Sequence, residues 1–294
     1  MVMKKSTDMI ALSIISYMVI GLIAFLCVIP FIILLVSSFT SEHYIINYGY
    51  TLFPKEFSTS AYRMIFAYPE KILNSYGISI FVTLFGTAVS LFLASMAAFV
   101  MYKKEVRYRN QMAFYLYFTT LFSGGLAPYY IILTTGYHLK NKLAVLLLVP
   151  MFNVMYLLIL RNFIKSSIPD SLIESAKIDG AGDFKTFIQI ILPLSKPALA
   201  SIGLFTALNY WNDWWTPMMF VEREALFPLQ YRLYLILSSV NMAANVVQSA
   251  VSVSLPQESL KLALTVVSTG PIILAYPFVQ KYFVKGITLG SVKG

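Results

Sequence analysis

The chain has 294 residues, of which 58% are hydrophobic and only 12% are charged, and its mean hydropathy is +0.73. Soluble domains carry roughly 25% charged residues, so this composition predicts an all-α integral membrane protein, because the apolar runs are far longer than the roughly 10-residue segments of an outer-membrane barrel. The chain has a single cysteine, Cys27, which excludes a disulfide framework and a thiolate metal cluster. Its net charge is +9, but the basic residues do not form a run interleaved with aromatics, which argues against a nucleic-acid partner.

The first apolar run extends from about residue 10 to 36 and is long enough to cross a bilayer with some tilt. It is longer than the core of a signal peptide, and no small-residue cleavage pattern follows it, so we interpret it as a retained span. Lys4 and Lys5 precede it, which places the N-terminus inside the cell, where basic residues concentrate. Residues 41–73 mix tyrosines, prolines and charges of both signs, and predict an outside loop.

The second span is predicted over residues 75–101, and small residues recur along it at every fourth position: Gly86, Ser90, Ala94 and Ala98. Such a stripe lets helix backbones approach closely in lipid, so this helix is expected to pack in the centre of a bundle. Four basic residues then predict an inside loop: Lys103, Lys104, Arg107 and Arg109.

The third span, about 112–133, contains Ser123, Gly124, Gly125 and Pro128, which together weaken helix continuity. A broken helix at membrane depth is tolerated against protein or a water-filled cavity, so the break indicates either a kink that lines a pathway or a simple packing bend. The fourth span is predicted over 143–160. Both histidines, His43 and His138, fall in predicted outside loops, so no metal site is expected.

Residues 161–197 form a long polar interruption in this apolar chain. Pro169 and Asp170 suit the start of a helix over 170–178, because proline is tolerated at the first turn and an acid complements the positive end of the helix dipole. Gly180 is suited to the left-handed turn that ends a helix. A second helix is predicted after Asp183, continuing until Pro193 and Pro197 redirect the chain.

Glu174-Ser175-Ala176, Asp179-Gly180-Ala181 and the downstream Ile190, Leu192 and Pro193 make this stretch resemble the cytoplasmic EAA loop of permease subunits of binding-protein-dependent ABC importers. Ser175 is the one departure, a small residue in place of alanine. The resemblance implies that the first helix is a coupling helix, which docks on a separate ATPase subunit. The residues it assigns to coupling are Glu174, Ser175, Ala176, Asp179, Gly180 and Ala181.

The fifth span is predicted from Pro197 to about Met219, and all three tryptophans lie near its outer end, in the segment 209–215. Tryptophans there are typical of an interfacial belt. Polar groups within a span usually face a cavity or partner, however, and aromatic faces beside amides and a carboxylate suit a sugar ring. On this second reading the substrate path is lined by Asn209, Trp211, Asn212 and Asp213.

Residues 221–257 predict the longest outside segment, in which the apolar stretch 229–237 is too short to span. A last span over 260–283 completes six, with both termini inside, and leaves a cytoplasmic tail of residues 284–294. The ending 281–294, together with segments 52–66, 209–217 and 227–233, is similar to the second permease subunit of maltose-type carbohydrate importers, especially the branch that imports oligosaccharides. That likeness implies ATPase contacts by Gly286, Gly290, Lys293 and Gly294.

Taken together, the chain is expected to be a single transmembrane permease domain, residues 1–294, with the type I ABC importer fold and core spans over about 75–284. The resemblance implies a heterodimer with a second homologous permease, two ATPase subunits, an extracytoplasmic solute-binding protein, a carbohydrate substrate and lipid of the bacterial inner membrane. No G-x-x-x-x-G-K-[ST] loop is present, so the chain is expected not to be an enzyme and to hold no cofactor, with ATP and Mg²⁺ bound by the partner ATPase.

There are three alternatives to this interpretation. The same machinery could carry another solute, such as an amino acid or polyamine, because the loop motif is shared across those systems. An ion-coupled secondary transporter would be expected to carry midplane carboxylates, and only Asp213 qualifies. A membrane-embedded hydrolase needs a catalytic constellation that the two loop histidines do not supply.

Overall fold

The computed structural model describes residues 7–247 and 256–290. All regular elements in that part of the chain are helices, and the only β pairing there is an isolated bridge between Thr40 and Phe57. The chain divides into two compact units, Met1–Tyr68 with Leu235–Pro271, and Pro69–Tyr234 with Ile272–Gly294. The prediction of an all-helical protein is therefore confirmed for the described residues.

The first unit contains α1 (Thr7–Ser38), α2 (Glu42–Tyr48), α3 (Ser60–Ile65) and the beginning of α15 (Gln257–Gly290). The most apolar window of α1 has no buried residue, as expected of a helix whose side chains meet lipid or another subunit. The carboxylate of Glu42 accepts the backbone N–H groups of Glu258 and Ser259, both at 2.9 Å. These are free N–H groups of the first turn of α15, so a segment predicted as loop caps that helix.

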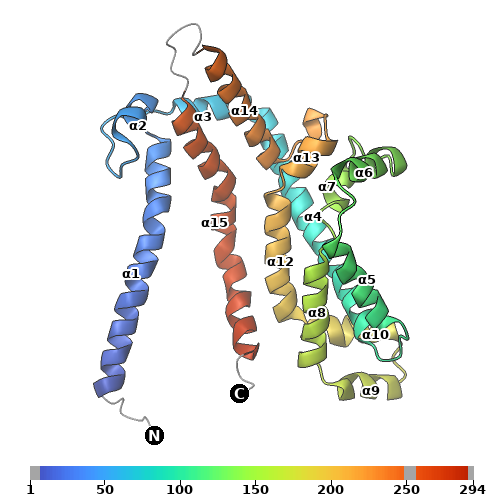
Figure 1. Cartoon of the computed structure of the whole chain (residues 1–294). Helices are drawn as coiled ribbons and strands as arrows, with labels where there is room; N and C mark the ends of the chain where they lie inside the picture. Colours follow the sequence, from blue (N-terminus) through green and yellow to red (C-terminus); the bar gives the residue numbers. More distant parts are fainter. Residues whose placement is uncertain (1–6, 248–255, 291–294) are drawn as a thin grey trace. The chain divides into compact units, whose positions relative to one another are not determined.

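The core of the second unit is built by α4 (Pro69–Tyr102), α8 (Val154–Ser167) and α12 (Lys196–Trp211), which pack alongside one another (Figure 1). The predicted small-residue stripe on α4 is buried along its whole length, so its packing role is confirmed. At Gly86 the approach is closest, because a Cβ there would lie 2.6 Å from the ring of Tyr210 on α12. The Tyr210 hydroxyl in turn donates to the carbonyl of Leu147 at 2.7 Å.

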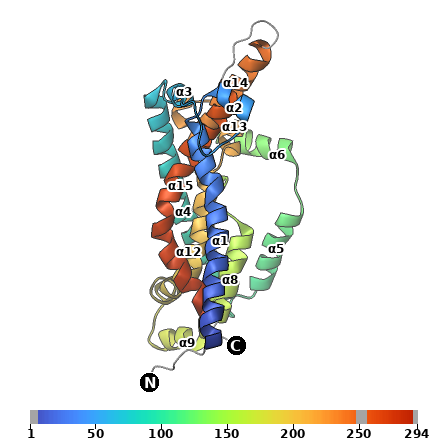
Figure 2. The ribbon, with the colours of Figure 1, turned by 90° about the vertical axis from the view of Figure 1, so that its left-hand side faces the viewer.

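The predicted third span is broken where the glycines fall. α5 (Arg109–Leu121) ends before the break, and α6 (Leu126–Ile131) with the π-helix η1 (Ile132–Gly136) follows at an angle of 116° (Figure 2). Gly125 has φ +89°, a conformation that glycine adopts without the clash of a Cβ. The break is confirmed, whereas its role as a pathway kink or a packing bend stays open.

The prediction of one continuous fourth span over 143–160 is wrong. α7 (Leu143–Leu148) ends before Pro150, and α8 starts only at Val154, where the side chain of Asn153 accepts the backbone N–H of Tyr156 at 3.3 Å. Proline removes a helix hydrogen bond and asparagine is a favoured N-cap, so together they end one helix and start another. α8 then continues to Ser167, well into the predicted polar interruption.

The chain beyond α8 contains further short helices. They are α9 (Asp170–Ile178), α10 (Asp183–Thr186), η2 (Phe187–Ile191), α11 (Leu192–Leu194), α13 (Trp215–Phe220), η3 (Glu224–Leu226) and α14 (Leu229–Val247). The predicted fifth span is thus divided, because α12 ends at Trp211 and α13 is separate. The 19-residue helix α14 was missed, since the apolar stretch at its start was interpreted only as too short to span.

The start of α14 is attached to α4 within the second unit. Arg232 is buried and donates from Nε to the Ser75 hydroxyl at 2.6 Å and from a terminal nitrogen to the Glu224 carbonyl at 2.8 Å. The backbone N–H of Leu229 donates to the Ser79 hydroxyl at 2.7 Å. These bonds satisfy a buried guanidinium and a free helix N–H, so hydroxyls on α4 determine where α14 begins.

The predicted tail is not separate from the last helix in its described part, since α15 runs through Gly286 to Gly290, whereas Lys293 and Gly294 lie outside the described residues. Among the described residues, two helices are long and apolar enough to cross a membrane, Leu12–Ser38 and Pro69–Tyr102. Two bent pairs, Arg109–Leu121 with Leu126–Gly136 and Asp183–Leu194 with Lys196–Trp211, raise the number to four if each pair is one span. The count of six stays a prediction.

Candidate functional site

The EAA loop (residues 161–197) contains a short helix with well-defined ends. α9 spans Asp170–Ile178, as predicted, with Pro169 in extended conformation before it. At its end Gly180 has φ +74°, the N–H of Ala181 donates to the carbonyl of Ala176 at 2.8 Å, and the N–H of Gly180 donates to that of Lys177 at 3.0 Å. This pair of bonds is the Schellman arrangement, so the predicted glycine stop is confirmed.

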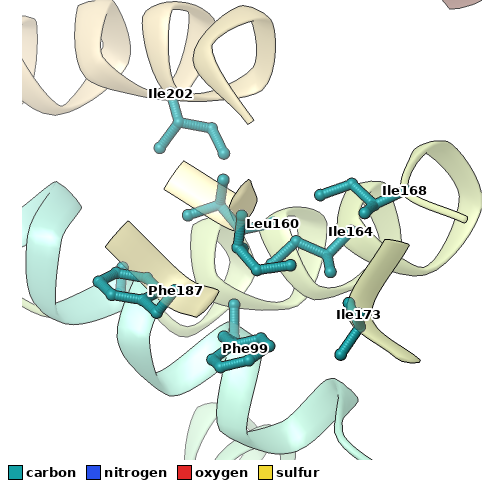
Figure 3. Packing of buried hydrophobic residues seen from close by; sticks show 10 residues of the cluster. Phe99, Leu160, Ile164, Ile168, Ile173, Phe187 and Ile202 are labelled. Atoms are coloured by element: carbon teal, nitrogen blue, oxygen red, sulfur yellow. The ribbon is translucent and has the colours of Figure 1, made fainter. Parts of the chain in front are cut away.

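One side of α9 packs on the protein core. Ile173 and Ala176 are buried, and Ile173 belongs to a cluster of buried residues from α4, α8, α9, η2 and α12. Figure 3 shows the labelled members of this cluster, which are Phe99, Leu160, Ile164, Ile168, Ile173, Phe187 and Ile202. Ile173 thus anchors α9 in the same hydrophobic cluster that contains Ile202 of α12.

Other residues of the loop are open to solvent. Three of its apolar side chains are strongly exposed, with exposed fractions of 44% for Leu172, 86% for Ile178 and 63% for Phe184. Of the residues predicted to couple, Glu174, Ser175, Asp179 and Gly180 are exposed, Ala181 is half-buried and Ala176 is buried. The Glu174 side chain makes no hydrogen bond or ion pair within the part of the chain that the structure describes. Glu174 lines a small pocket together with Lys104 and Lys177, while exposed apolar side chains such as those of this loop are typical of a docking surface.

Three ion pairs hold the EAA loop to the segment that follows α4, and the sequence analysis missed them. Consecutive residues Lys103, Lys104 and Glu105 pair with Asp183, Asp170 and Lys177, respectively, and the Lys104 pair measures 2.5 Å between Nζ and Oδ2. The ammonium of Lys104 holds the pKa of the Asp170 carboxyl below its usual range, and Lys177 does the same for Glu105. Lys103 and Lys104 were interpreted only as signs of topology. The available signal in the sequence was complementary charge: residues 103–105 are positive, positive and negative, and the loop offers two acids and a lysine as partners.

The second helix of the loop is continuous with α12 except at one bend. α10, η2 and α11 follow one another through Pro193, and the chain turns by 79° between Leu194 and Lys196. In an α-helix a proline ring clashes with the carbonyl four residues earlier, and the wide π turn of η2 falls at that position. The predicted redirection by Pro193 and Pro197 is therefore confirmed as a bend between the two prolines, although the helix itself continues through Pro193.

A pocket of about 270 Å³ lies at the other end of α12. Its lining residues are Val149, Pro150, Asn209, Asn212, Asp213, Trp214, Trp215 and Thr216. Three of the four predicted path residues are therefore brought together, whereas Trp211 is buried, with 7% of its surface exposed, and lies outside this lining. Trp214 and Trp215 take its place, because the chain leaves the helix at Asn212 and a 3.6-residue helical period no longer decides which side chains share a face.

Aromatic pairs flank the pocket on two sides. The rings of Trp214 and Tyr234 stack with centroids 5.0 Å apart, and those of Trp215 and Tyr129 lie 6.4 Å apart. Asp213, one residue before the N-cap Trp214, accepts the backbone N–H of Thr216 through Oδ1 at 2.9 Å and so satisfies a free N–H of the first turn of α13. Asp213 thus has a structural role as well as a position in the pocket. Among the described residues no group of His, Cys, Asp and Glu could hold a metal ion.

Comparison with known proteins gives one consistent result. Residues 78–289 match the family of binding-protein-dependent transport system inner membrane components. The chain is 40% identical over 272 residues to the polygalacturonan/rhamnogalacturonan transport system permease protein YtcP of Bacillus subtilis (strain 168), covering 92% of this chain and 94% of that protein. It is 25% identical over 281 residues to the arabinooligosaccharides transport system permease protein AraQ of the same organism, covering 93% of each.

A solved structure supports the same assignment. The crystal structure of a bacterial ABC transporter involved in the import of the acidic polysaccharide alginate contains a chain that is 28% identical, with a TM-score of 0.75 and coverage of 95% of this chain and 99% of that one. This likeness extends over both compact units. The chain therefore belongs to the family of inner-membrane components of binding-protein-dependent transport systems, has the type I ABC permease fold, and is a membrane permease and not an enzyme.

Proposed function

We propose that this chain is one of two permease subunits of an ATP-driven, binding-protein-dependent importer of a carbohydrate, in particular an oligosaccharide released from a polysaccharide. The observation that carries the proposal is the EAA loop, in which a capped helix presents Glu174 and exposed apolar side chains while its other side packs into the core. The relatives named for polygalacturonan, rhamnogalacturonan and arabinooligosaccharide transport support the choice of substrate class.

In this proposal α9 is the coupling helix and docks in a cleft of a separate ATPase subunit. The exposed Glu174 pairs with a basic residue of that subunit, and Leu172, Ile178 and Phe184 supply apolar contact. The three ion pairs to residues 103–105 connect the loop to the end of α4. Gly286, Gly290, Lys293 and Gly294 add a second contact with the ATPase, which binds the ATP and Mg²⁺.

The helix α12 joins the docking surface to the pocket. It has 16 residues and is therefore ~24 Å long at 1.5 Å per residue, with the EAA loop at one end and Asn209, Asn212 and Asp213 near the other. A rigid helix in contact with both places can convert a displacement of α9 into a change in the pocket. We propose that the pocket lies on the substrate path.

The proposed membrane arrangement has six spans, with both termini and the EAA loop in the cytoplasm of a bacterial cell and the pocket towards the outside. Basic residues concentrate on the proposed cytoplasmic side, as the positive-inside bias requires. The remaining partners are a second, homologous permease, two ATPase subunits, and a solute-binding protein that delivers the sugar to the outer face.

An amino acid or polyamine importer is the nearest alternative, since it would use the same loop. The pocket favours a sugar, because indole faces beside two amides and a carboxylate offer stacking and hydrogen bonds to a hydroxyl-rich ring. An ion-coupled transporter is less well supported, because Asp213 is already engaged in a hydrogen bond with the first turn of α13.

The test is to purify the complex through a tag on this chain, reconstitute it in vesicles with the binding protein outside, and measure oligosaccharide uptake. Uptake is expected to require ATP in the compartment that holds the ATPase and to be abolished by omitting the binding protein. Uptake driven by a sodium or proton gradient without ATP would contradict the proposal. An amino acid or polyamine transported in place of the sugar would leave the machinery assigned and overturn the substrate class.

A further inference from the structure

The polar groups of the pocket at the end of α12 have an unbalanced charge. Its lining includes one carboxylate, Asp213, and no lysine, arginine or histidine. Within the described residues, no basic side chain lies within 4.0 Å of that carboxylate. Its one hydrogen bond, from the Thr216 N–H, is to a neutral backbone group. The pocket is therefore an acidic site without a compensating cation.

The other lining groups are suited to sugar hydroxyls. The Asn212 side-chain carbonyl accepts from Gln230 at 3.3 Å, and within the described residues its NH₂ group and the whole Asn209 amide have no hydrogen-bond partner. Amide donors and acceptors beside a carboxylate acceptor match hydroxyl groups, which both donate and accept. Trp214, 42% exposed, and Trp215 add ring faces for the apolar C–H side of a sugar.

We propose that this pocket is a subsite for a neutral sugar ring, and that Asp213 excludes a ring that carries a carboxylate. The proposal rests on the proposed function, because it requires the pocket to lie on the substrate path. The physical reason is that a uronate placed among these residues brings a second negative charge beside Asp213 in a partly desolvated site, where like charges repel more strongly than in water. An oligosaccharide made of uronate units is therefore expected to cross this point more slowly than its uncharged counterpart.

The decisive variant is Asp213→Asn. Asparagine has the shape of aspartate and its side-chain oxygen is also an acceptor, so it retains the hydrogen bond to Thr216 while it removes the charge. A matched pair of substrates varies the charge of the sugar: an oligogalacturonate and its methyl ester, which differ in the negative charge and one methyl group at each carboxyl. Comparing the two uptake rates between variants, with one binding protein throughout, cancels the binding protein's own preference.

We expect Asp213→Asn to raise the ratio of acid to ester uptake about tenfold, which corresponds to about 1.4 kcal/mol. Asn209→Asp, at an exposed position of the same pocket, adds a charge and is expected to lower the ratio. If the Asp213→Asn complex fails to assemble, the Asn209→Asp variant still tests the proposal. Unchanged ratios in the assembled variants would mean that the pocket does not meet the sugar. A fall in acid uptake by Asp213→Asn would mean that the carboxylate recruits the acid through a cation, and would equally overturn the proposal.

Failure of the proposed function gives a different result. In that case the unaltered complex takes up neither the acid nor the ester in an ATP-dependent manner, whatever the residue at position 213. ATP-dependent uptake of either sugar by the unaltered complex, with no shift of the ratio in the variants, leaves the importer assignment intact and removes only the subsite.

Discussion

Replacing Gly180 by valine tests the coupling loop at the point where the structure allows the cost to be worked out. Gly180 has φ +74°, and no heavy atom lies within 4 Å of the position that a Cβ would occupy. A Cβ at this position therefore meets no neighbouring group, and we assign the cost of the substitution to the backbone conformation. An L-residue in the left-handed region costs roughly 1–2 kcal/mol, and a β-branched residue lies at the upper end.

The loop can avoid this strain only by giving up its cap. If residue 180 leaves positive φ, the bonds from Ala181 to Ala176 and from Gly180 to Lys177 are lost, at about 0.5–1.5 kcal/mol each. Either route lowers the population of the correctly ended helix, by about tenfold for each 1.4 kcal/mol. We expect uptake and ATPase copurification to fall accordingly, while the protein still inserts in the membrane.

Two further substitutions at this position control for other causes. Asparagine tolerates the left-handed conformation better than other non-glycine residues, so Gly180→Asn is expected to retain most coupling, with Gly180→Ala between asparagine and valine. The measurement is ATPase recovered per permease and uptake per complex for all three variants. Full coupling by Gly180→Val, or an asparagine variant as impaired as the valine variant, would refute the reasoning from backbone conformation.

Three further predictions concern other parts of the second unit. Glu174→Ala is expected to weaken ATPase copurification, whereas Lys185→Ala, an exposed lysine of the same loop, is expected to leave it unchanged; equal recovery of ATPase with both would argue against a docking carboxylate. Gly86→Ala is expected to destabilise the complex by about 1–3 kcal/mol, because its Cβ would lie 2.6 Å from the ring of Tyr210. Thermal unfolding measures this effect, and Gly77→Ala is the control because a Cβ at position 77 meets open space. The pKa of the Asp170 carboxyl is lowered, so its ion pair stabilises the loop fully above the ordinary carboxyl pKa, and this stabilisation is lost as the pH falls through the lowered pKa. Protection of the loop from proteolysis is therefore expected to persist down to about pH 4 and to decline below it. A decline already between pH 7 and 5 would show that another group controls the loop.

The features that could be predicted from the sequence are those decided by neighbours along the chain. The bounds of α9 and the positive φ of Gly180 follow from a proline and an acid at one end and a glycine at the other, within a dozen residues. The buried stripe from Gly86 to Ala98 follows from a four-residue period, and the break near Gly125 from two glycines and a proline. Helix ends and periodic faces depend on local hydrogen bonds and steric limits, which the residue order expresses directly.

Other features were decided only by which distant segments meet. Residues 103–105 pair with loop residues that lie 66 to 80 positions away, and although their charge order complements the loop, only packing brings the two segments together. The pocket is lined by Trp214 and Trp215, and not by the predicted Trp211, because the chain leaves the helix at Asn212. Ion pairs and pocket linings depend on three-dimensional proximity, and packing of the bundle supplies that proximity. A local sequence pattern specifies an element, whereas tertiary packing chooses its contacts.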